Sequence, residues 1–72
     1  MQRYQLEIKA NKRPEVLERL LRVIRHRGFE VCHLTAEVDE NRVTVQVTVQ
    51  SERERALLVH QLIKLPDVMD IQ

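Results

Sequence analysis

The pattern of apolar and polar positions divides the first half of the chain into a strand and a helix. Between residues 4 and 8 apolar and polar residues alternate, which predicts a strand with one buried face. Apolar residues then recur at helical spacing between Pro14, which is favoured in the first turn of a helix, and Gly28, which is a typical stop. We therefore expect a helix over about 14–27.

A second and a third strand follow, and they are predicted to form a hairpin. Alternation resumes at Phe29, but near Cys32 and His33 its phase shifts by one residue, which predicts a β-bulge there. A polar turn at residues 39–41 leads into residues 43–49, where Val alternates with Thr or Gln. The second strand should therefore be bent and paired with the third.

The end of the chain predicts a second helix and a short last strand. Ser51 and Glu54 have the spacing of a capping box, and Pro66 should end the helix near Leu65. The strand is expected over 68–71. The apolar face of the helix is expected to consist of Ala56, Val59, Leu62 and Ile63.

The element order βαββαβ is that of an α+β, ferredoxin-like fold, in which two helices cover one face of a four-stranded antiparallel sheet. Right-handed crossovers place the first and third strands in the centre. The 72 residues suffice for one domain, residues 1–72, with an aliphatic core, because Tyr4 and Phe29 are the only aromatic residues. One Cys allows no internal disulfide, so such a small core favours an oligomer or a larger host.

Charge is balanced overall and uneven along the chain. The 12 basic and 11 acidic residues give a net charge of +1, but residues 9–27 alone sum to +5 and the rest to −4. We expect a basic surface on the first helix that could contact phosphates or an acidic protein, although a solvated charged face is the ordinary outcome. The candidate docking residues are Arg19, Arg22, Arg25 and His26.

Other functions known for the ferredoxin-like fold require residues that this chain lacks. A metal chaperone would need two thiolates before the first helix, where the chain reads ANKRP, and a phosphate-cradling loop would need Gly residues there. An RNA-binding sheet would need aromatic residues on its central strands. Cys32 and His33 are adjacent on a strand and should point to opposite faces, and the three His residues have no ligand spacing. We therefore predict a protein with no catalytic or metal site of its own.

The chain also has no apolar run of about 20 residues and no signal-peptide pattern after Met1, so no membrane segment is expected. A single free thiol is typical of a cytoplasmic protein, and that location is our expectation.

Two stretches resemble a known family. VLERLLRVIRHRGFEVC, residues 16–32, and QLIKLPDV, residues 61–68, are similar to the small regulatory subunits of acetolactate synthase, most closely those of the isozyme II type. These are ACT-domain proteins. The resemblance implies a subunit without cofactors that binds and activates a large catalytic subunit, whose cofactors are thiamine diphosphate, Mg²⁺ and FAD. It also implies a homodimer with side-by-side sheets.

The same resemblance points to an effector loop that has lost its usual residues. Feedback-inhibited ACT domains carry a motif similar to Asn/Asp-x-Pro-Gly-x-Leu, and residues 12–17 match it only at Pro14 and Leu17. Glu15 replaces the Gly, and a carboxylate there would repel a ligand carboxylate, although it would also favour the helix dipole. We therefore expect valine insensitivity. The effector-loop candidates are Asn11, Lys12, Pro14, Glu15 and Leu17, with Glu30 where inhibited relatives carry Asn.

Two further functions remain open at the level of sequence. The first is a free-standing ACT-type domain that senses an amino acid, and the second is a basic module that binds nucleic acid. The balanced net charge and the scarcity of aromatic residues make nucleic acid the less favoured partner.

Overall fold

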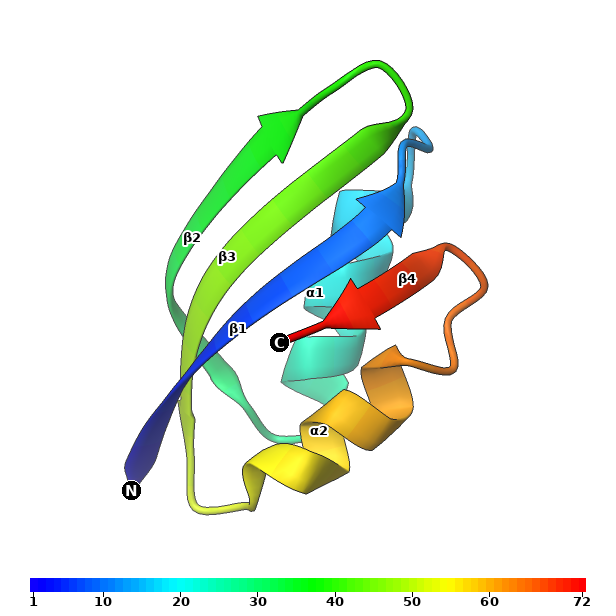
Figure 1. The fold of residues 1–72 in the computed structure, drawn as a ribbon. Helices are drawn as coiled ribbons and strands as arrows, with labels where there is room; N and C mark the ends of the chain where they lie inside the picture. Colours follow the sequence, from blue (N-terminus) through cyan, green and yellow to red (C-terminus); the bar gives the residue numbers. More distant parts are fainter.

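The computed structural model describes residues 1–72 and contains the six expected elements in the expected order. The strands are β1 (Gln2–Asn11), β2 (Glu30–Val38), β3 (Arg42–Ser51) and β4 (Val68–Ile71), and the helices are α1 (Val16–His26) and α2 (Arg55–Leu62). The antiparallel sheet has the order β2-β3-β1-β4, and both helices cover one of its faces (Figure 1). The ferredoxin-like fold with β1 and β3 in the centre is thus confirmed.

Alternation along the strands sorts their side chains between two faces of the sheet. In the β1–β3 pair, Leu6 lies opposite Val47 and Ile8 opposite Val45, and all four side chains are buried under the helices. The other face carries polar residues and is left uncovered. The register of β2 against β3 shifts at Cys32, so the predicted bulge is confirmed.

Helix α1 is shorter than the predicted span 14–27. Pro14 and Glu15 form a turn, in which the Val16 amide donates to the Arg13 carbonyl at 3.2 Å, and the helix begins after it. Gly28 ends the helix at a φ of 86°, with its amide bonded to the Arg25 carbonyl. The Phe29 amide bonds to the Ile24 carbonyl, which completes a Schellman motif.

Helix α2 departs most from the prediction. The predicted capping box is wrong, because Ser51 is the buried last residue of β3. Its hydroxyl donates a hydrogen bond to the Gly28 carbonyl at 2.8 Å and accepts one from the Arg53 amide at 3.0 Å. The helix also ends at Leu62 rather than Leu65. After Leu62 the amides of Lys64 and Leu65 bond three residues back, in turns that precede Pro66.

The apolar face predicted for α2 was wrong in part. Leu58 and Leu62 are fully buried, whereas Ala56 is exposed and Ile63 is 45% exposed. The helix carries apolar residues of its own on several sides, so their spacing alone does not identify the buried side.

The core lies between the sheet and the two helices. It consists of 13 apolar residues, and the only buried polar residue is Ser51. The Tyr4 and Phe29 rings pack at its edge with centroids 6.4 Å apart. Neither helix has the length and apolar content that a membrane span requires.

Candidate functional site

The loop between β1 and α1, residues 12–15, is held by its backbone to two neighbouring segments. The Asn11 amide donates to the Asp67 carbonyl at 2.8 Å, and the Lys12 amide donates to the Asn41 carbonyl at 3.0 Å. The first of these bonds ties the last residue of β1, just before the loop, to the segment before β4, and the second ties the loop itself to the β2–β3 turn. The loop position is therefore fixed by residues far away in the sequence.

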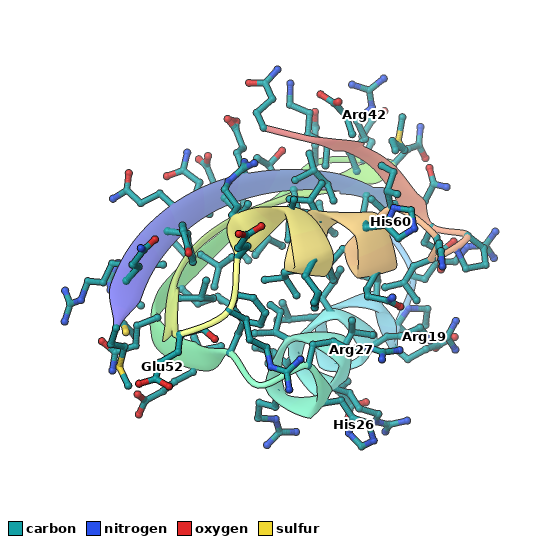
Figure 2. All side chains as sticks on the ribbon, turned by 90° about the horizontal axis from the view of Figure 1, so that it is seen from below. Arg19, His26, Arg27, Arg42, Glu52 and His60 are labelled. Carbon is teal, nitrogen blue, oxygen red and sulfur yellow. The ribbon has the colours of Figure 1, made fainter.

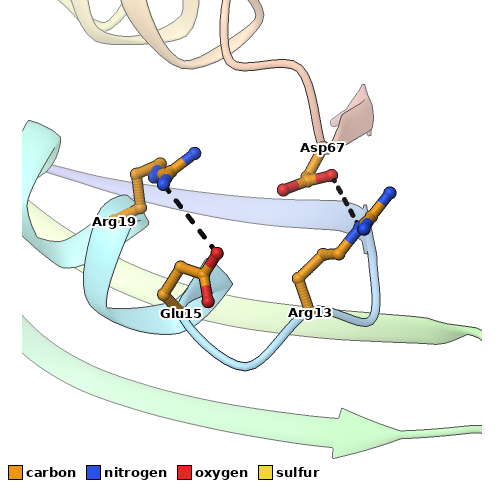
Figure 3. A network of polar contacts seen from close by, with 4 residues as sticks. All are labelled: Arg13, Glu15, Arg19 and Asp67. Atoms are coloured by element: carbon orange, nitrogen blue, oxygen red, sulfur yellow. Dashed lines mark ion pairs between the residues drawn. The ribbon is translucent and has the colours of Figure 1, made fainter.

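Two ion pairs involve this loop (Figure 3). Arg13 Nε lies 3.4 Å from Asp67 Oδ1, and the Asp67 side chain is only 18% exposed. Arg19 lies 4.0 Å from Glu15 one turn along the helix, and both side chains are about half exposed. Solvent screens exposed pairs to about 0–1 kcal/mol each. The pairs orient the loop more than they stabilise the fold.

Glu15 occupies the N-cap position of α1 without capping it. Its φ and ψ are −103° and 10°, and its side chain makes no hydrogen bond to the first-turn amides. Its backbone carbonyl accepts the first helical bond, from the Arg19 amide at 3.0 Å. Apart from its 4.0 Å ion pair with Arg19, the carboxylate is exposed beside the positive end of the helix dipole.

The structure does not bring all of the effector-loop candidates together. Leu17 is half-buried and packs on the core, and Pro14 lies in the exposed turn before α1. Glu30 lies at the other end of the sheet, where its carboxylate accepts a hydrogen bond from Gln50. Glu30 and Arg3 of β1 both lie opposite Gln50 of β3. Asn11 is eight residues after Arg3 on β1, which at the rise of a strand puts Asn11 about 26 Å from the level of Glu30.

Surface depressions lie away from the loop. One of about 410 Å³ crosses the uncovered face of the sheet and is lined mainly by Gln and Thr, with His33 at one side. The other, of about 660 Å³, lies near the start of β2 and includes Glu30, Arg25 and Arg53. Neither contains a residue between 11 and 17, so one copy of the chain does not form an enclosed site at the loop.

The docking candidates all lie on one side of α1. Arg19, Arg22, Arg25 and His26 are exposed, opposite the buried face of Val16, Leu20 and Ile24. In Figure 2 the curved sheet lies above the helices, and His26 projects from the side of α1 farthest from the sheet. These four residues are named together as the basic helix face.

Candidate chemical groups elsewhere are dispersed. No three His, Cys, Asp or Glu residues are grouped as metal ligands. Cys32 is a free, exposed thiol at the bulge of β2. The sequence did not identify Asp67 and Ser51 as contacts, because their partners Arg13 and Gly28 are distant in the chain and become neighbours only when the sheet forms.

Comparison with known proteins agrees with this architecture. Residues 12–71 match the family described as ACT domain. The crystal structure of the ACT domain from the GTP pyrophosphokinase of Chlorobium tepidum has a TM-score of 0.85 and 11% identity, over 97% of this chain and 94% of that one. A homoserine dehydrogenase from Thiobacillus denitrificans has a TM-score of 0.69 and 16% identity, over 99% of this chain and 17% of that one. These likenesses concern the fold.

Sequence relatives narrow the family. The acetolactate synthase isozyme 2 small subunit of Escherichia coli K12 is 44% identical over 99% of this chain and 84% of its own length. The protein of the same description from Shigella flexneri matches equally. The chain therefore belongs to the ACT-domain family and, within it, to the small subunits of acetolactate synthase.

Proposed function

We propose that this chain is a non-catalytic regulatory subunit that binds and activates the large catalytic subunit of an acetolactate synthase. The observation that carries the proposal is the 44% identity over 99% of the chain to the isozyme 2 small subunit of Escherichia coli. The partner would condense two pyruvates, or pyruvate with 2-oxobutyrate, using thiamine diphosphate, Mg²⁺ and FAD that it binds itself.

The distribution of polar groups in this chain supports a non-catalytic role. The only buried polar side chain is Ser51, and both of its hydrogen bonds serve to join β3 to the end of α1. A catalytic acid, base or nucleophile is normally held beside other such groups in a water-excluding cleft. The His, Cys, Asp and Glu side chains here are dispersed over the surface instead.

Reconstitution tests this function directly. The purified chain should form no acetolactate alone, and it should raise the activity of the catalytic subunit of the same organism in a saturable way. The ACT domain of the Chlorobium tepidum GTP pyrophosphokinase is a suitable control, because it has the same fold at 11% identity and should not activate. A chain that binds an amino acid but never raises the activity would instead be a free-standing sensor.

The proposal includes a homodimer formed through β2. This strand lies at one edge of the sheet, spans nine residues and has no partner on its outer side, whereas the opposite edge strand, β4, spans four. A long unpaired edge favours pairing with a second copy. The core has only 13 of the 72 residues and would gain from the apolar area buried in such an interface.

Such a dimer would also complete the effector site. Antiparallel pairing of two β2 strands over their full length places Glu30 of one copy opposite Val38 of the other. Val38 adjoins the β2–β3 turn, whose Asn41 carbonyl binds the Lys12 amide of the effector loop. Glu30 and Glu15 would then approach one site from two copies, and we propose that their charges make this subunit insensitive to valine.

A further inference from the structure

The outward side of α1 carries a cluster of exposed basic side chains. Its four residues, Arg19, Arg22, Arg25 and His26, fall within about a third of the helix circumference, given the 100° turn per residue of an α-helix. Arg27 follows at the C-cap and is exposed as well. Glu18 is the only acidic residue within α1. It lies on this same side, one turn before Arg22, and it forms no ion pair.

The rest of the molecule does not neutralise this surface. The structure contains two ion pairs, and of the basic helix face only Arg19 takes part in one, at 4.0 Å from an exposed Glu15. Arg22 and Arg25 have no carboxylate within ion-pair distance. The guanidinium groups of Arg22, Arg25 and Arg27 therefore remain available for contacts outside the chain.

The helix dipole accounts for only part of this charge. Arg25 and His26 lie in the last turn, where a cation favours the negative end of the dipole. The dipole effect falls off within that turn, so it gives no reason for Arg19 and Arg22 to be basic. Helix stability alone therefore does not explain this surface.

The remaining features favour an acidic protein over a nucleic acid. Residues outside 9–27 sum to −4, so the basic region is a local patch on a nearly neutral molecule. Tyr4 is half-buried and Phe29 is buried, which leaves no exposed aromatic side chain on which bases could stack. Arg is also suited to bidentate contacts with carboxylates.

We propose that the basic helix face docks on an acidic surface of the acetolactate synthase catalytic subunit. This proposal rests on the function proposed above. Because the basic helix face points away from the sheet, docking there leaves the outer backbone of β2 free for pairing. Charge complementarity should act mainly by steering the encounter and fixing its orientation.

The test uses the full chain with Arg19→Glu and Arg22→Glu together, and it measures binding to the purified catalytic subunit over a range of salt concentrations. We expect affinity to fall more than tenfold, with a slower association rate and a weaker salt dependence. Arg19→Lys with Arg22→Lys should retain most of the binding. Arg3→Glu with Arg42→Glu changes the net charge equally on β1 and β3, and it should alter affinity less than twofold.

Each outcome has a definite meaning once circular dichroism and thermal unfolding show that the variants are folded. If the wild-type chain binds and both double reversals have equal effects, the docking proposal is wrong and the proposed function stands. If the wild-type chain does not bind the catalytic subunit at all, both fail. Salt-sensitive binding to a random-sequence DNA duplex that only Arg19→Glu with Arg22→Glu abolishes, with subunit binding unchanged, would identify nucleic acid as the partner and overturn the proposal.

Discussion

At the scale of single residues, the side chain of Ser51 joins three parts of the fold. Its hydroxyl hydrogen-bonds the Gly28 carbonyl after α1 and the Arg53 amide before α2, and its backbone ends β3. The spacing to Glu54 suggested that Ser51 caps a helix, and a capping residue directly precedes the first helical residue. Ser51 instead ends β3, and α2 begins only at Arg55, three residues later than a capping box requires. A residue of this kind is identified only when the Gly28 carbonyl is known to lie beside it.

Ser51→Ala should therefore destabilise the protein more than its small change in volume implies. The substitution removes both hydrogen bonds and leaves the Gly28 carbonyl and the Arg53 amide without this partner, which typically costs about 1–3 kcal/mol of unfolding free energy. Urea unfolding followed by circular dichroism measures the change. Glu52→Ala, at the exposed position next to Ser51, should change it by less than about 0.5 kcal/mol. Equal midpoints for the two variants would show that water replaces the hydroxyl.

At the scale of elements, the strands were predicted better than the helices. Alternation in residues 43–49 has one interpretation, because successive side chains of a strand point to opposite faces, and the phase shift at Cys32 located the bulge in β2. Helix ends depend on local hydrogen bonds that composition does not specify. Pro14 forms a turn before α1, and the chain after Leu62 changes to tighter turns.

Helix α2 offers a test of which side chains stabilise the fold. Leu58 is fully buried and Ile63 is 45% exposed, although the apolar face predicted from the sequence included Ile63 and not Leu58. Leu58→Ala should cost about 2–4 kcal/mol through lost burial and a residual cavity, and Ile63→Ala should cost less than about 1 kcal/mol. Both values come from urea unfolding. A larger loss for Ile63→Ala would mean that the face predicted from the sequence is the one that packs.

At the scale of the whole molecule, a dimer through β2 is the expected state. Light scattering should give about twice the 8.6 kDa chain mass at tens of micromolar. Thr35→Glu adds a charge on the edge strand close to its middle, where full-length pairing sets residue 35 of one copy diagonally across from residue 35 of the other. Like-charge repulsion should therefore weaken the dimer by about two- to fivefold. Gln5→Glu adds the same charge on central β1 and should leave the mass unchanged. A wild-type mass of one chain would contradict side-by-side sheets.

The candidate effector site shows what a sequence of one chain leaves undetermined. The sequence identifies Lys12, Glu15 and Glu30 as departures from a sensing motif, but it does not place them. The strand register puts Asn11, which leads into the loop that contains Glu15, and Glu30 at opposite ends of the sheet. Whether they share a site therefore depends on a second copy, which is a property of the assembly.

Valine binding provides the decisive measurement on that assembly. If Glu15 and Glu30 exclude an amino-acid carboxylate, millimolar valine should neither bind the unmodified chain in calorimetry nor inhibit the reconstituted enzyme. Glu15→Gly with Glu30→Asn should favour binding by about 1–2 kcal/mol, tenfold or somewhat more, because it removes two repelling charges. Glu7→Gln with Glu54→Gln removes the same charge elsewhere and should give no gain. Saturable binding of valine to the unmodified chain at micromolar concentration would show that these carboxylates do not close the site, and that the chain senses the amino acid.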